Sequence, residues 1–308
     1  MDEKRVRAVV ALGMFDGVHI GHQRLLLETA ALAGRLHAAA VACTFENHPL
    51  SVLGERPRLL TDAAQRRELL LAAGMDQVRM ERFDAALAHS TPERFVEHLA
   101  TLWTLAGVVV GYNYTFGERA CGTPETLRAL GAQRGFAVAV LPPVSVGDEP
   151  VSSTRIRLLL EREGDVRRAA ALLGRPYRLS GRVIPNRQNG RRFGFPTANI
   201  AAAQDAVLPL SGVYATRALA DGRWRPAVTN VGTNPTVHGD HVTVETHVLD
   251  FAGDLYGEAL SVDFIERLRG ERRFDSEQEL VARIARDAAR AREPVSYTHL
   301  TLPTILLV

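Results

Sequence analysis

The hydrophobic pattern of this chain of 308 residues changes near Gly174. Before that point, short apolar runs of strand length alternate with helix-length segments, and after it short alternating runs are broken by Gly, Pro and Asn. Strands that alternate with helices are typical of a parallel, doubly wound α/β sheet, whereas closely spaced strands with turn residues are typical of an antiparallel barrel. The sequence therefore predicts an α/β protein with two domains, residues 1–174 and residues 175–293, of which the second is a small antiparallel barrel.

The first domain also indicates where a ligand would bind. Strands are expected at residues 6–12, 38–45, 77–83, 107–110 and 137–140, with helices at 23–36, 65–73, 92–105 and 123–134. Ligands of open parallel sheets bind at the carboxyl ends of the strands. The loops after Leu12, Phe45 and Val110 are therefore the places where functional residues are expected.

The end of the chain is expected to close the barrel domain with a helix. Residues 276–292 have the period of an amphipathic helix, with Ser276 as the expected N-cap and Glu279 at the matching capping-box position. Residues 294–308 contain no Asp, Glu, Lys or Arg, in a chain otherwise dominated by Ala and Arg. We interpret this segment as a non-native tail, and the alternative is a genuine C-terminal strand.

The basic residues exclude several kinds of ATP and carbonyl chemistry. Lys4 is the only lysine among the 37 basic residues, and no glycine loop precedes it. A Walker P-loop, a protein-kinase site and a Schiff-base enzyme each need a suitably placed lysine. Those three mechanisms are therefore excluded.

Charge and hydropathy favour an ordinary globular protein. The formal net charge of +2 lacks the basic excess that is typical of nucleic-acid binding. No segment approaches the roughly 18 continuous apolar residues of a membrane helix, and the N-terminus has no secretory signal pattern. Two cysteines, Cys43 and Cys121, are too few for a disulfide framework. We expect a cytoplasmic protein with no nucleic-acid or membrane partner, and the oligomeric state stays open.

A glycine- and histidine-rich segment, Gly13–His22 (GMFDGVHIGH), lies between the first expected strand and the first helix. Gly13 and Gly17 permit a tight turn with backbone N–H groups facing a ligand, and Gly21 permits a close approach to the helix. His19 and His22 are three residues apart, so both imidazoles could face one anion at the helix N-terminus. This arrangement suits stabilisation of phosphate charge without a covalent intermediate. The alternative is a pair of histidines that only cap or pack the helix.

A second segment, Gly190–Ile200 (GRRFGFPTANI), lies in the barrel half. Gly190 and Gly194 indicate a flexible loop that could face phosphates. Thr197 and Asn199 are two apart in an extended stretch, so their side chains point to the same side. Two neutral oxygen ligands suit Mg²⁺ that takes its other ligands from ATP and water. The alternative is a polar turn between strands.

Four segments of the first half resemble the HxGH nucleotidyltransferases, and specifically the adenylyltransferase module of bacterial bifunctional riboflavin kinase/FAD synthetases. They are GMFDGVHIGH at 13–22, TFENHP at 44–49, GYNYTFGERACGT at 111–123 and VSSTRIR at 151–157. The resemblance implies a Rossmann-like domain. It also implies that Arg157 supplies a fixed cation to the nucleotide and that Phe116 lies near a ring.

The barrel half resembles riboflavin kinase over 176–292, with GRRFGFPTAN as the defining motif. The resemblance implies that Glu245 is the general base on the ribityl 5′-hydroxyl, because an alcohol needs such help. The alternative is a solvent-facing carboxylate on a strand. Arg269 and Arg273 could close over the flavin or the phosphates, or equally form a solvated helix face.

Together, the residues and the resemblance give a set of expected sites. The expected catalytic residues are Glu245, His19, His22 and Arg157. ATP or its phosphates are expected to contact Gly13, Phe15, Asp16, Gly17, Gly21, His48, Asn113, Ser152, Ser153, Thr154, Gly190 and Gly194. Phe116, Arg269 and Arg273 are expected at the flavin, and Thr197 and Asn199 at Mg²⁺.

The reaction that the resemblance implies has two steps. Riboflavin is phosphorylated by ATP to FMN, and the FMN phosphate then attacks the α-phosphorus of ATP to give FAD and pyrophosphate. One alternative is a nucleotidyltransferase with another acceptor, such as a pantetheine, choline or glycerol phosphate. Another is a non-catalytic flavin-binding regulator that keeps the fold.

Overall fold

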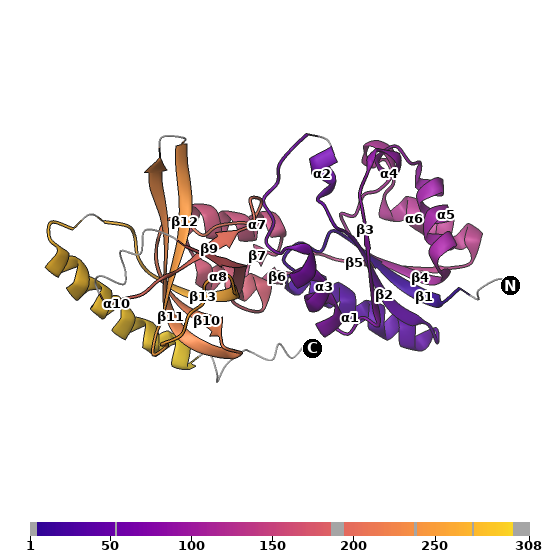
Figure 1. Ribbon diagram of the computed structural model, residues 1–308. Helices are drawn as coiled ribbons and strands as arrows, with labels where there is room; N and C mark the ends of the chain where they lie inside the picture. The colour runs from indigo at the N-terminus through magenta and orange to yellow at the C-terminus, as the bar shows by residue number, and fades with distance from the viewer. Residues whose placement is uncertain (1–4, 53, 186–193, 237–238, 273, 298–308) are drawn as a thin grey trace. The chain divides into compact units, whose positions relative to one another are not determined.

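The computed structural model describes residues 5–52, 54–185, 194–236, 239–272 and 274–297. The chain forms two compact units, Met1–Ser153 and Thr154–Val308 (Figure 1). The division lies before the domain boundary expected at residue 174. The reason is that helix α8 (Val166–Leu173) of this segment packs on barrel strands, as described below.

The first unit contains a parallel five-stranded sheet in the order β3-β2-β1-β4-β5, flanked by helices (Figure 1). Its strands are β1 (Arg7–Leu12), β2 (Ala39–Phe45), β3 (Gln77–Glu81), β4 (Thr104–Gly111) and β5 (Ala137–Leu141). Its helices are α1 (Ile20–Arg35), α2 (Pro49–Val52), α3 (Ala63–Ala72), α4 (Ala85–Ala88), α5 (Pro92–Leu102), the 3₁₀ turn η1 (Glu118–Ala120) and α6 (Pro124–Arg134). A small hairpin of β6 (Ser145–Val146) and β7 (Glu149–Pro150) follows. The strand order confirms the predicted doubly wound α/β sheet.

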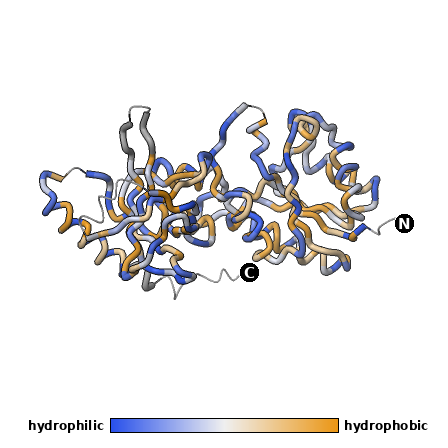
Figure 2. The backbone as a smooth tube through the Cα atoms, viewed as in Figure 1, coloured by the Kyte–Doolittle hydropathy of each residue, from blue (hydrophilic) through white to orange (hydrophobic). Residues whose placement is uncertain are grey.

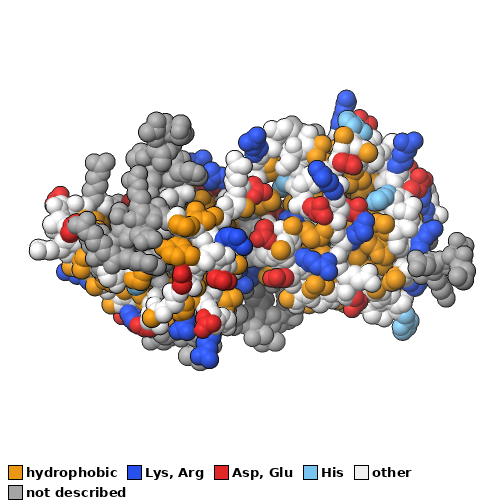
Figure 3. All heavy atoms as spheres, in the orientation of Figure 1, with side chains coloured by type: hydrophobic (Ala, Val, Ile, Leu, Met, Phe, Trp, Pro, Cys, Tyr) orange, Lys and Arg blue, Asp and Glu red, His pale blue; other side chains and the backbone are white. Residues whose placement is uncertain are grey.

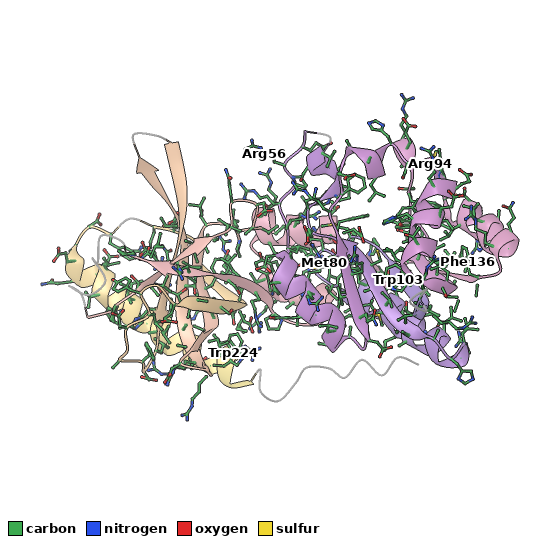
Figure 4. All side chains as sticks on the ribbon, turned by 45° about the vertical axis from the view of Figure 1, so that its right-hand side comes forward. Arg56, Met80, Arg94, Trp103, Phe136 and Trp224 are labelled. Atoms are coloured by element: carbon green, nitrogen blue, oxygen red, sulfur yellow. The ribbon has the colours of Figure 1, made fainter. Side chains whose placement is uncertain are left out.

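Alternate residues of the central strands bury both faces of this sheet. Ala8, Val10 and Leu12 pack with α5 and α6 on one face, whereas Val9 and Ala11 pack with α1 and α3 on the other. Trp103 and Phe136, labelled in Figure 4, belong to the α5–α6 side. Figure 2 shows the resulting hydrophobic stretches along the central strands. Burial on both faces explains why the sequence of these strands is continuously apolar.

The second unit is a closed antiparallel barrel in the order β10-β11-β12-β9-β8-β13. Its strands are β8 (Tyr177–Ile184), β9 (Ala198–Ala202), β10 (Gly212–Ala220), β11 (Arg223–Thr236), β12 (Gly239–Val248) and β13 (Ala259–Arg269). Three helical segments precede it, namely α7 (Ser153–Leu158), the π-helix η2 (Leu159–Glu163) and α8 (Val166–Leu173). Helix α8 packs on β13 and β8, which joins the segment before residue 174 to the barrel.

The closing helix α10 (Glu277–Tyr297) packs on β10, β11 and β13. Ser276 Oγ accepts a hydrogen bond from the Glu279 N–H at 3.1 Å, which confirms the predicted N-cap. The Glu279 carboxylate accepts from the N–H of Asp275, at 3.4 Å. The helix continues beyond its expected end at residue 292, into the segment that we interpret as a tail, and residues 298–308 lie outside the described part of the chain.

Close strand pairing in the barrel depends on Gly181. A Cβ at this position would lie 2.4 Å from the carbonyl oxygen of Ala201 and 2.8 Å from a side-chain carbon of Ile200. We expect Gly181→Ala to lower the free energy of unfolding of the barrel unit by about 1–3 kcal/mol, measured by calorimetry. The control is Gly34→Ala in helix α1, where a Cβ meets nothing within 4 Å and should stabilise its helix by up to about 1 kcal/mol. Equal effects of the two substitutions would contradict this packing.

Candidate active sites

The loop after β1 is a strained turn anchored by buried side chains. Phe15, Gly17 and Val18 have positive φ angles of 50°, 80° and 40°. Phe15 and Val18 are 0% and 2% exposed, so burial of their side chains offsets the cost of this backbone conformation. Gly13 leaves room for the Phe15 ring, since a Cβ there would lie 3.1 Å from it. The structure thus places Phe15 as an anchor of the loop, inside the core.

His19 and His22 lie side by side at the start of α1. Their rings are stacked, with centroids 3.6 Å apart and an interplanar angle of 14°. His19 Nδ1 accepts a hydrogen bond from the His22 N–H at 3.3 Å, and His19 is the N-cap of the helix. In the neutral ring, the proton must then be on Nε2, which leaves Nε2–H as a hydrogen-bond donor. The structure therefore brings the two predicted histidines together and also gives His19 the capping role.

Asp16 holds the loop from below. It is 2% exposed, and its carboxylate accepts hydrogen bonds from the N–H groups of Leu60, at 2.9 Å, and Thr61, at 3.1 Å. The Thr61 hydroxyl in turn accepts from the Gly17 N–H at 3.1 Å. Asp16 therefore holds the loop after β1 in place by hydrogen bonds to the backbone that precedes α3. Sequence reasoning missed Thr61, because its partners are more than forty residues away.

The SST segment reaches the same loop through one residue. Ser153 Oγ donates a hydrogen bond to the Asp16 carbonyl at 2.8 Å. Ser152 precedes it, whereas Thr154 and Arg157 belong to α7 and to the second compact unit. The structure places Ser153 in contact with the first motif. The roles of Ser152, Ser153, Thr154 and Arg157 in binding ATP stay predictions.

The other two loops of the first unit contain three candidates, of which one is half-buried, one exposed and one buried. His48 Nδ1 accepts from the Leu50 N–H at 3.2 Å in the loop after β2. Asn113 is exposed in the loop after β4. Phe116 is 6% exposed and packs against Phe95, with ring centroids 5.3 Å apart. The ring of Phe116 is therefore part of the core, and a flavin contact by this ring stays an untested expectation.

In the barrel, Glu245 lies on β12 between two asparagines of neighbouring strands. Asn199 on β9 and Asn230 on β11 are its register partners. Glu245 lines a cavity of about 350 Å³, and burial raises the pKa of its carboxyl above the usual range. The apolar lining of this cavity is formed by Phe195, Val213, Val228, Phe274, Leu280 and Ile284. A carboxylate with a raised pKa in a mostly apolar cavity fits a general base better than a solvent-facing strand residue.

Thr197 lies where two cavities meet. It lines the Glu245 cavity and also a second cavity of about 50 Å³, which is lined by residues including Phe251, Asp254 and Tyr256. His247 Nδ1 lies 2.8 Å from the Pro196 carbonyl, which ties the segment before Thr197 to β12. Thr197 therefore borders both cavities.

Arg269 is held at the rim of the Glu245 cavity. It ends β13, and its Nε donates to Asp287 of α10 at 2.8 Å. Asp287 is 1% exposed and also lies 3.3 Å from Arg283. Arg269 is thus on a strand and not on a solvated helix face. Gly194 has a φ of 80°, and the other two expected residues of this region, Gly190 and Arg273, lie outside the described residues.

The visible surface has no single dominant charge. Figure 3 shows Lys/Arg and Asp/Glu side chains interspersed over the face that it presents. Trp224 on the barrel, labelled in Figure 4, lies against the guanidinium groups of Arg178 and Arg217, at 4.6 Å and 4.8 Å. Both arginines also contact the buried Asp263.

Within the described residues, no helix is both long and apolar enough to span a membrane.

Comparison with known proteins links each unit to one activity. A family model described as "FAD synthetase" matches residues 1–155, and one described as "Riboflavin kinase" matches residues 173–295. A Streptococcus pneumoniae crystal structure, described as a macrolide-efflux protein, has a TM-score of 0.86 and 30% identity and covers 93% of this chain and 94% of its own.

Curated relatives cover nearly the whole chain. A protein of Escherichia coli K12 is 36% identical over 92% of this chain and 92% of its own length. One of Bacillus subtilis is 31% identical over 94% and 93%, respectively. Both are named bifunctional riboflavin kinase/FMN adenylyltransferase. The chain therefore belongs to the family of bifunctional riboflavin kinase/FMN adenylyltransferases, transferases with a nucleotidyltransferase and a kinase domain in one chain.

Proposed function

We propose that the barrel phosphorylates riboflavin in the Glu245 cavity, with the phosphates of ATP at Thr197, which lines both this cavity and the smaller one. The observation that carries this proposal is the position of Thr197 on both cavities, with Glu245 lining the larger one. The apolar lining of the larger cavity suits an isoalloxazine ring. Glu245 takes the proton of the ribityl 5′-hydroxyl. The hydroxyl oxygen bonds to the γ-phosphorus of ATP, and the bond between the γ-phosphorus and the departing ADP breaks.

We infer that Thr197 and Asn199 contribute neutral oxygen ligands to Mg²⁺. Asn199 lies opposite Glu245 across β9 and β12, and Thr197 lies two residues earlier on the same side of the chain. The described residues contain no group of three or more His, Cys, Asp or Glu placed to hold a metal ion. Such a sparse donor set suits an ion that is bound chiefly by ATP phosphates and that neutralises their charge.

This assignment predicts a kinase-specific change in the magnesium requirement. Asn199→Ala should raise the Mg²⁺ concentration for half-maximal riboflavin phosphorylation by about tenfold, because one ligand is lost. FMN adenylylation by the same protein should keep its Mg²⁺ dependence, which makes it the internal control. A titration in which both activities shift equally, or neither shifts, would refute the ligand role.

In the first unit, we propose that the start of α1 stabilises the phosphates of ATP during adenylyl transfer. His19 Nε2–H and the helix N-terminus would donate to phosphate oxygens while His22 stacks on His19. An oxygen of the FMN phosphate bonds to the α-phosphorus, and the bond to pyrophosphate breaks. Phosphate is already anionic at neutral pH, so this step needs no strong base.

The acceptor can be tested directly. ATP is incubated with the full chain and one acceptor at a time, namely FMN or a pantetheine, choline or glycerol phosphate, and pyrophosphate release is measured. We expect release with FMN at a rate at least about a hundredfold above the others, because a site built for one acceptor leaves its polar groups unpaired with another. A preference for another acceptor would overturn the proposal, and no release with any acceptor would favour a non-catalytic regulator.

We further infer a cytoplasmic enzyme whose partners are small-molecule substrates, with no nucleic-acid or membrane partner. We retain residues 1–174 and 175–293 as the functional domains, with 294–308 as a non-native tail. The two family models match on either side of residues 156–172, which is compatible with that division.

A further inference from the structure

Arg66 of α3 is the largest fully buried side chain among the described residues, at 0% exposed. Its Nη2 donates to the carbonyl of Phe45 and, at 3.3 Å, to that of Glu46. Among the described residues, Nε and Nη1 have no hydrogen-bond partner. A buried guanidinium with unused donors is costly to a core, so a compensating role is expected.

The charge of Arg66 is balanced from the loop after β1. Burial lowers the pKa of Arg66, whereas the Asp16 and Asp62 carboxylates raise it. Asp16 is itself 2% exposed and belongs to the loop that leads to His19 and His22. Two buried opposite charges interact more strongly than exposed ones, because little water screens them.

The segment that carries Arg66 contacts both loops. Arg66 donates to the Phe45 and Glu46 carbonyls, which precede His48 at the end of β2. Just before α3, the N–H groups of Leu60 and Thr61 donate to the Asp16 carboxylate in the loop after β1. A further hydrogen bond joins the two loops directly, from Thr44 Oγ1 to the Met14 carbonyl at 2.9 Å.

We propose that Arg66 is a positioning residue for FMN adenylylation, which fixes the 45–48 segment against the loop that carries His19 and His22. It acts through these loops and does not itself contact substrate. The proposal rests on FMN adenylylation at this site, so it is tested only with a parent protein that converts FMN to FAD.

The test compares neighbouring arginines in the full chain. Arg66→Gln removes the charge, Arg66→Lys keeps it but loses the forked geometry, and Arg67→Gln is the matched control. Arg67 is exposed, and its Nη1 donates to the Val78 carbonyl at 3.0 Å. The measurements are KM for ATP in FMN adenylylation, kcat, thermal unfolding and riboflavin phosphorylation in the same samples.

We expect Arg66→Gln to raise KM for ATP in FMN adenylylation by about tenfold and Arg66→Lys by about threefold, because charged hydrogen bonds to the loop are lost or weakened. Arg67→Gln should leave KM within about twofold, and phosphorylation should be unchanged in all three. Equal KM values for Arg66→Gln and Arg67→Gln would overturn the proposal. So would Arg66→Lys resembling Arg66→Gln. Should Arg66→Gln fail to fold, a folded Arg66→Lys protein with the parental KM would overturn it.

Discussion

Glu245→Gln should reduce riboflavin phosphorylation by about 10²–10⁴-fold while leaving conversion of supplied FMN to FAD unchanged. The amide keeps the size of the side chain in the cavity of about 350 Å³ but cannot accept the proton of the ribityl hydroxyl. FMN formation is measured by chromatography. The matched control is Glu258→Gln, an exposed carboxylate of the same unit that lines neither of the two proposed substrate cavities. If the Glu245→Gln protein phosphorylated riboflavin at the parental rate, Glu245 would be excluded as the general base.

The pH profile gives a second view of the same residue. Burial raises the pKa of Glu245, and only the deprotonated carboxylate acts as a base. Phosphorylation should therefore be full above this raised pKa and fall as the pH drops through it. The acidic limb should lie above the usual range for a glutamate. A limb at the usual glutamate pKa would show that Glu245 is not the titrating group.

The substitution pair His19→Asn/His22→Ala should abolish FAD formation from FMN while riboflavin phosphorylation continues. Loss of one transition-state donor costs roughly 10²–10³-fold, and both imidazoles are removed here. Asn is chosen at position 19 because it is a strong N-cap whose side-chain oxygen can accept the hydrogen bond from the His22 N–H that His19 Nδ1 now accepts. The double variant should therefore unfold at a temperature close to that of the parent.

Pyrophosphate release in the presence of FMN measures this effect. His89→Asn is the control, because His89 is exposed on the first unit and forms only a weak pair with Glu118, at 3.4 Å. Normal adenylylation by a folded double variant would show that the histidines only cap and pack the helix.

The sheet was predictable because its information is local. Each strand of the first unit is a short apolar run between helices, which predicts a parallel sheet, whereas the strand order β3-β2-β1-β4-β5 came only from the structure. The GMFDGVHIGH segment was likewise predictable as the turn between a strand and a helix. What the sequence could not show was which distant groups hold that loop. Thr61 and Arg66 lie just before and within the first turn of α3, where the sequence contains no recognisable motif.

The barrel site shows the same limit more clearly. Alternating runs predicted the long strands, but β9 is short and pairs with β12 at only two positions, Asn199 with Glu245 and Ala198 with Thr246. That pairing places the predicted metal ligand opposite the predicted base, yet it depends on barrel closure across more than forty residues. Asn230, the other register neighbour of Glu245, was not among the predicted site residues. Nothing local in the sequence of α8 indicates that this helix packs on the barrel strands β8 and β13.

The central claim is that one chain carries both reactions at separate sites. The most direct measurement is a time course of the full chain with riboflavin, ATP and Mg²⁺, in which flavins, ADP and pyrophosphate are separated by chromatography. The account predicts that FMN and ADP appear first and that FAD and pyrophosphate follow. FMN as the final product would contradict the adenylylation site, and the absence of any new flavin would contradict both.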